Sequence, residues 1–216
     1  MKPSSLSPSA WPRWVRALAF GAVFGGIGYG LGAWLAKVAP GGFGLADKAI
    51  RWSDGLALLV GFALVAGSLW SLYVSLDAKR LGRMYGLEGD ASREETRLAR
   101  FQAAVIGFSG VILTLPIVFS LAGVSPVLGV AAIGLLLVLH TVMNVRVYRQ
   151  ADELLRRAVM ETAAVTFFAG QLVLFMWAAA ERLGGVPPIT AWDIYAVLMT
   201  LYLAASLWIG VRRGLA

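Results

Sequence analysis

The sequence predicts an all-α integral membrane protein, a single bundle of six transmembrane helices arranged as three hairpins, with both termini in the cytoplasm. Of its 216 residues, 59% are hydrophobic and 14% are charged, whereas soluble domains are about half apolar and a quarter charged. Charge-free stretches long enough for a helix to cross a hydrocarbon core of about 30 Å recur along the chain. Lys and Arg gather in alternate connections between these stretches, which is the pattern of a multi-pass protein.

The longest apolar stretch is residues 101–145, forty-five residues without one Asp, Glu, Lys or Arg. That is roughly twice the length that one helix needs to cross a bilayer. Gly123-Val124-Ser125-Pro126 interrupts it near the middle, and proline lacks the N–H that would continue a helix. We therefore predict a helical hairpin, with spans at about 101–122 and 127–146.

The first span is predicted at about 17–36, after a polar tail at 1–12 and the two arginines Arg13 and Arg16. It is longer than the apolar core of a signal peptide, so we expect it to be retained. Small residues spaced four apart let another helix approach closely, which predicts a contact with a protein partner or a second copy. Gly21 with Gly25, and Gly28 with Gly32, form two pairs with this spacing.

The second span is predicted at about 55–76, with Ser53 or Asp54 as its N-cap. Before it, residues 43–52 mix aromatic and apolar side chains with charged ones, which is typical of a short amphipathic helix at the membrane surface. A plain interfacial connection is the alternative for this segment.

The helices of the third and fifth spans have clear start signals. Ser92-Arg93-Glu94-Glu95 fits a capping box, so the helix of the third span should begin about two turns before the membrane. Asp152 should cap a helix that enters the fifth span at about 162–181. The sixth span is predicted at about 194–211.

The charge distribution predicts the orientation. With six spans, one face of the membrane receives fifteen of the nineteen Lys and Arg residues, and the other receives only Lys37, Lys48, Arg51 and Arg182. The positive-inside rule places the first face, and with it both termini, in the cytoplasm of a bacterial inner (plasma) membrane. Because the basic residues stand at helix ends, the net charge of +7 indicates topology and a lipid partner, not nucleic acid.

His140 is the one histidine, and it lies about 9 Å inside the membrane when counted back from Arg146 at about 1.5 Å per residue. Asn144 follows one turn later on the same face. We expect His140 to form a hydrogen bond with a neighbouring helix, and a proton carrier or ligand contact is the alternative. Other polar residues proposed for this layer are Ser71, Thr166 and Ser206 at similar depth, and Gln171 near the middle of the fifth span.

The residue types also limit the chemistry. Cysteine is absent, which excludes thiolate ligands, disulfides and cysteine nucleophiles. One histidine without cysteine is a poor basis for a metal or haem site. We therefore predict no metal, no cofactor and no catalytic residues.

Two segments resemble known proteins. Gly107-Phe108-Ser109-Gly110 followed by His140-x-x-x-Asn144 is similar to pieces of the rhomboid intramembrane serine proteases, but in the reverse order and without their second histidine, so it predicts no protease. The last hairpin, about 150–213, resembles small uncharacterised bacterial membrane proteins. They share an Asp-Glu-x-x-Arg-Arg-x-x-x-Glu segment, and the resemblance implies no activity. Here that segment comprises Asp152, Glu153, Arg156, Arg157 and Glu161.

Three classes of function remain open from the sequence. The near absence of buried ionisable groups favours a non-catalytic accessory, assembly or regulatory subunit of a membrane complex. Six short spans with a thin polar layer could instead form a small carrier or substrate-binding subunit for a hydrophobic molecule, similar in size and span number to the S-components of vitamin uptake systems. The third class is an intramembrane enzyme. It has the weakest support, because the sequence shows no nucleophile with a base. A ligand-sized cavity beside His140 would favour the carrier.

Overall fold

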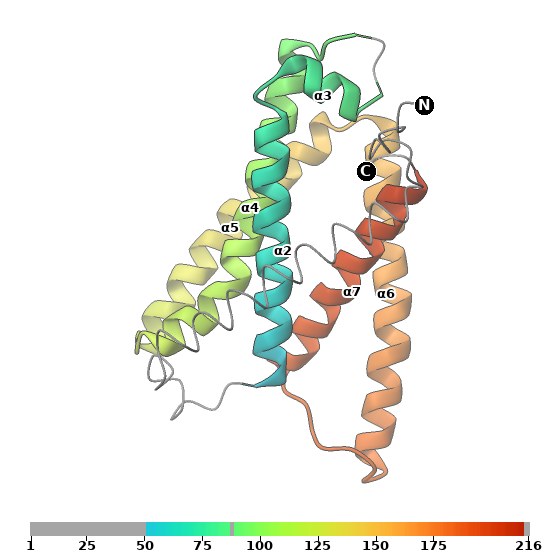
Figure 1. The fold of residues 1–216 in the computed structure, drawn as a ribbon. Coiled ribbons are helices and arrows are strands. Elements are labelled where there is room, and N and C mark those ends of the chain that lie inside the picture. Colours follow the sequence, from blue (N-terminus) through green and yellow to red (C-terminus); the bar gives the residue numbers. More distant parts are fainter. Residues whose placement is uncertain (1–50, 87–88, 214–216) are drawn as a thin grey trace, which may run out of the picture. The chain divides into compact units, whose positions relative to one another are not determined.

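The structure is a computed structural model that describes residues 51–86 and 89–213. These residues are all-helical, without a strand. Five of the helices are long and apolar enough to cross a membrane, all except the short α3. The helices are α2 (Trp52–Val74), α3 (Ala78–Met84), α4 (Arg93–Leu121), α5 (Pro126–Gln150), α6 (Glu153–Arg182) and α7 (Ala191–Arg212), shown in Figure 1.

A long apolar helix lies at the place of each of the second to sixth predicted spans. These helices belong to one compact unit that begins at Ile50. The predicted first span at 17–36 with its four glycines, and nearly all of the 43–52 segment, lie outside the described residues. The count of six spans, the single bundle over 13–216 and the side on which the termini lie therefore stay predictions.

Two of the predicted helix starts are confirmed and one is wrong. Ser92 Oγ accepts from the Glu95 amide at 3.2 Å, and Glu95 Oε2 accepts from the Ser92 amide at 2.7 Å. Asp152 Oδ1 accepts from the Leu155 amide at 2.8 Å. The N-cap of α2, however, is Arg51 and not Ser53 or Asp54. Asp54 instead occupies the third helical position, where its carboxylate accepts from the Arg51 amide at 2.8 Å.

The connection between α2 and α4 contains a helix that the sequence did not single out. Asp77 caps α3 by accepting from the amides of Lys79 and Arg80. Its Leu81 is fully buried in a small cluster with residues from α2, α4 and the loop before α4. Arg100 of α4 donates to the Ser75 carbonyl at the end of α2, at 2.8 Å and 3.3 Å, which satisfies a carbonyl that the helix itself leaves free.

The described helices contact one another in the order α5, α4, α2, α7, α6. Helix α2 packs against both α4 and α7, whereas α5 packs chiefly against α4, and α6 chiefly against α7. We call α5 and α6 the edge helices. Only Gly129 of α5 is buried, although α5 is apolar over most of its length. The described helices thus form an open series, because each edge helix has one main helix neighbour among them.

The α2–α4 pair is the tightest contact, and glycine permits it. A Cβ atom on Gly110 would lie 2.6 Å from the carbonyl oxygen of Gly61, and one on Gly107 would lie 2.5 Å from Ser68 Oγ. No real Cβ tolerates such distances, so these backbones can approach only without side chains. The buried residues Ala57, Val60, Leu113 and Ile117 form the core between the two helices.

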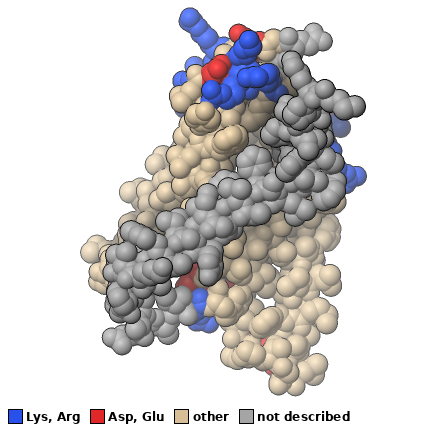
Figure 2. All heavy atoms as spheres, in the orientation of Figure 1, with Lys and Arg blue, Asp and Glu red and all other residues tan. Residues whose placement is uncertain are grey.

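Charged residues separate to the ends of the described helices. We call one end the basic end; it comprises α3, the C-termini of α2, α5 and α7, and the N-termini of α4 and α6. Figure 2 shows Lys and Arg gathered at this end. The opposite end, which we call the Asp193 end, contains Arg51, Asp54, Glu181, Arg182 and Asp193.

Candidate functional site

His140 forms a hydrogen-bonded cluster with Ser109 and Asn144. Its Nε2 lies 2.6 Å from Oγ of Ser109 on α4, so the ring bridges α5 to α4. Asn144 Nδ2 lies 3.0 Å from the same ring nitrogen and donates to the His140 carbonyl at 2.9 Å. The Phe108 ring meets the imidazole edge-on, with 5.9 Å between centroids.

Ser109 contacts both its own helix and His140. Ser109 Oγ lies 2.9 Å from the Val105 carbonyl of its own helix, and a carbonyl can only accept. The Ser109 hydroxyl has one proton to donate, to the Val105 carbonyl or to His140 Nε2, and in either case its contact with His140 joins α4 to α5. The arrangement can hold α4 and α5 together in the membrane, where such a bond is worth about 0.6 to 2 kcal/mol.

The other residues proposed for the polar layer lie elsewhere. Ser206 donates to the Tyr202 carbonyl of its own helix at 2.7 Å. The buried hydroxyl of Thr166 has no hydrogen-bond partner among the described residues, Ser71 is half-buried, and Gln171 is exposed. None of the four bonds to His140 in the described part of the chain. Depth alone predicted a shared layer, but α5 packs chiefly against α4, and the bond of His140 to another helix is with Ser109 of α4. A ligand role for this layer stays a prediction.

The Asp193 end contains an ion pair that the sequence did not reveal. Arg51 Nη2 donates to Asp193 Oδ2 at 2.7 Å, and the Asp193 side chain is completely buried while that of Arg51 is 44% exposed. The same oxygen accepts from the Thr190 amide at 2.7 Å and from the Thr190 hydroxyl at 2.8 Å. The buried hydroxyl of Ser53 lies beside the carboxylate.

A second contact crosses between the same two helix starts. Trp192 Nε1 of α7 donates to Asp54 Oδ1 of α2 at 2.8 Å. Trp52 stacks on Trp177 of α6 with 6.5 Å between ring centroids. The capping box Thr190-x-x-Asp193 could have been found in the sequence. The pairing of Asp193 with Arg51 could not have been found in the sequence, because 142 positions separate the two residues.

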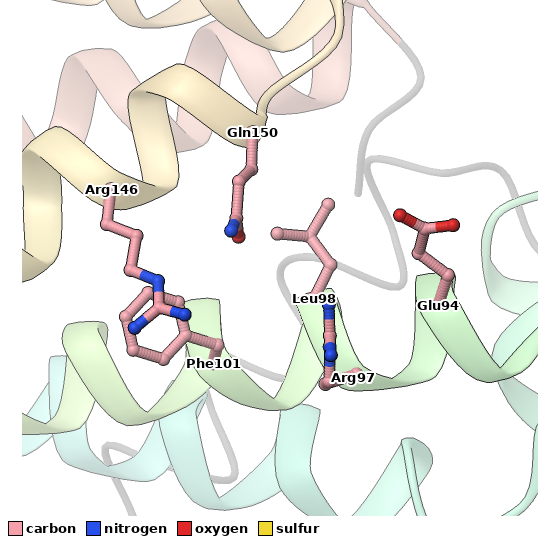
Figure 3. A pocket seen from close by; sticks show the side chains of 6 residues that line it. All are labelled: Glu94, Arg97, Leu98, Phe101, Arg146 and Gln150. Carbon is pink, nitrogen blue, oxygen red and sulfur yellow. The ribbon is translucent and has the colours of Figure 1, made fainter.

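A cavity of about 310 Å³ lies at the basic end, between α4 and α5. Figure 3 shows Arg146 reaching from α5 to the Phe101 ring of α4, and Gln150 pointing from α5 towards α4. The Arg146 guanidinium lies 5.5 Å from the centre of that ring, a cation–π contact. The lining residues are Glu94, Arg97, Leu98, Phe101, Arg146 and Gln150.

The residues of the Asp-Glu-x-x-Arg-Arg-x-x-x-Glu segment form caps, hydrogen bonds and ion pairs at the neighbouring helix ends. Asp152 caps α6, and Arg157 pairs with Glu153 one turn before it. Arg156 donates to the carbonyls of Tyr148 and Arg149, which end α5. The Glu161 carboxylate accepts a hydrogen bond from Arg213 at the end of α7, and it lies 3.8 Å from the Arg212 guanidinium. In this chain the segment therefore connects α5, α6 and α7.

The fold and these contacts define the class: an all-helical multi-pass membrane protein, with five described helices able to cross a bilayer. The chain matches no protein-family model, no curated protein and no solved structure.

Proposed function

We propose that this chain is a non-catalytic subunit of a membrane complex, with an accessory, assembly or regulatory role, in a bacterial inner membrane with both termini cytoplasmic. The observation that supports it best is Gln171, an amide exposed on the edge helix α6 in the middle of an apolar span. We further propose that the last hairpin belongs with the small bacterial membrane proteins whose charged segment it resembles.

Gln171 lies ten residues after Glu161 and eleven before Arg182, about 15 Å from either charge along the helix. Its amide forms no hydrogen bond within the described residues. Large apolar side chains surround it on α6, among them the exposed Phe167, Phe168 and Phe175. An amide facing hydrocarbon without a partner is costly, and a polar group on another helix is the usual remedy. The partner that fits is a transmembrane helix with a donor or acceptor near the bilayer centre.

The carrier is the alternative, and it needs a cavity beside His140. The 310 Å³ cavity lies at the basic end, and its lining includes neither His140 nor Ser109. The His140 ring is instead held between Ser109 and Asn144. These contacts of His140 fit a bridge between helices.

Native mass spectrometry of gently extracted protein tests the proposal. We expect a second polypeptide, or a second copy of this chain, to co-purify with it. Gln171→Ala should lower the bound fraction. Thr200→Ala should not, because the Thr200 hydroxyl is already satisfied by its own helix, donating to the Ala196 carbonyl at 2.8 Å. A single chain that carries a stoichiometric small molecule would favour the carrier instead.

A further inference from the structure

The cavity between α4 and α5 has the size and the composition of a small binding site. Its volume of about 310 Å³ is at the lower end of the range for small-molecule pockets. Two guanidinium groups, one carboxylate and one amide line it together with Leu98 and Phe101 (Figure 3). The site therefore combines positive charge with an apolar wall.

The two arginines of the cavity are not neutralised. Within the described residues, neither Arg97 nor Arg146 forms an ion pair, although Glu94 lines the same cavity. The Phe101 ring positions the Arg146 guanidinium without cancelling its charge. Arg100, by contrast, is engaged by the Ser75 carbonyl. Arg97 and Arg146 thus remain available to an anion.

The cavity lies where the apolar part of the hairpin ends. Phe101 is the first residue of the charge-free stretch 101–145, and Arg146 directly follows it. The cavity is therefore at the depth of lipid headgroups, and Phe101 is its lining residue inside the charge-free stretch. Basic pockets at this depth between transmembrane helices suit the headgroups of anionic and phosphate-bearing lipids.

We propose that this cavity binds a phosphate group through Arg97 and Arg146, with Glu94 facing a cationic substituent of the same ligand. The planar guanidinium presents paired donors that match phosphate oxygens. The Gln150 amide supplies a further donor, and the Glu94 carboxylate complements an amine such as that of a phosphoethanolamine headgroup. A phospholipid and a soluble phosphate ester share this chemistry. The site is independent of the partner proposed for Gln171.

Binding is measured on the full chain in detergent, by native mass spectrometry with added phosphatidylethanolamine, phosphatidylglycerol or diacylglycerol. We expect the two phospholipids to bind and the phosphate-free diacylglycerol not to bind. Arg97→Gln and Arg146→Gln should each weaken phospholipid binding about five-fold. In a parallel arm, inorganic phosphate is added as competitor: displacement of the lipid indicates a soluble ester as occupant, and resistance indicates the lipid itself.

Matched variants separate this site from general charge effects. Arg149→Gln removes a charge from the same end of α5 but lies outside the cavity, so it should leave binding unchanged. Glu94→Gln should keep phospholipid binding but abolish the preference for phosphatidylethanolamine over phosphatidylglycerol. Three results would each overturn the proposal. The first is an equal loss of binding in Arg149→Gln and Arg146→Gln, and the second is an unchanged affinity when both cavity arginines are replaced. The third is an unchanged headgroup preference in Glu94→Gln.

Discussion

The guanidinium of Arg51 covers the completely buried carboxylate of Asp193, with 2.7 Å between nitrogen and oxygen. The contact joins the N-terminus of α2 to the N-terminus of α7, and Trp192 and Asp54 add a second link. A buried carboxylate that loses its cation is left with the cost of its desolvation. This pair therefore should hold the two helix starts together.

Replacing Arg51 tests that role. We expect Arg51→Gln to lower the free energy of unfolding by about 1 to 3 kcal/mol, because the buried Asp193 loses its charged donor while the exposure of Arg51 moderates the effect. Arg157→Gln is the control, since Arg157 and Glu153 form an exposed pair within one helix turn that is worth less than about 1 kcal/mol. Thermal unfolding of both variants in detergent gives the comparison, and equal stability would contradict a structural role for the pair.

Two glycines should respond oppositely to alanine. At Gly110 the new Cβ would lie 2.6 Å from the Gly61 carbonyl oxygen, so Gly110→Ala should push α2 and α4 apart and lower the melting temperature. At Gly134 nothing lies within 4 Å, so Gly134→Ala should be neutral or stabilising by up to about 1 kcal/mol through helix propensity. A melting temperature that falls equally in both variants would remove the packing explanation.

A double-mutant cycle measures the bond between Ser109 and His140. Ser109→Ala and His140→Leu should each destabilise the protein, and together they should cost less than their sum by about 0.6 to 1.7 kcal/mol. His140→Gln, which keeps a donor and an acceptor, should retain the fold and any co-purifying partner. Strictly additive losses would show that the 2.6 Å contact contributes nothing to stability.

His140→Gln also separates the two roles of this residue. If His140 bridges helices, the variant should bind its partner at every pH between 5 and 8 as the wild type does. Loss of a pH-dependent or ligand-dependent behaviour in a normally folded His140→Gln protein would favour a carrier, because glutamine cannot take up a proton. Ring-nitrogen NMR of the wild type over the same pH range is the direct measurement.

Reporter fusions test the orientation. A reporter that is active only outside the cytoplasm should be silent when fused after Ala216 and active when inserted at Gly185, between α6 and α7. The basic end of α6 and the end of α7 would then both face the cytoplasm. Activity after Ala216 would overturn the six-span topology.

The sequence by itself determined the class, the positions of five long apolar helices and the starts of α4 and α6. Apolar length decides whether a helix can cross a bilayer, and a cap such as Ser92 with Glu95 acts within one turn, so both are local properties. The tertiary structure alone decided which polar residues meet. Depth along a span placed Ser71, Thr166 and Ser206 level with His140. The residue that bonds to His140 is instead Ser109, because α5 packs chiefly against α4. The Arg51–Asp193 pair and the cavity of Arg97 and Arg146 likewise depend on which helices are neighbours, and a single sequence carries no local signal for that.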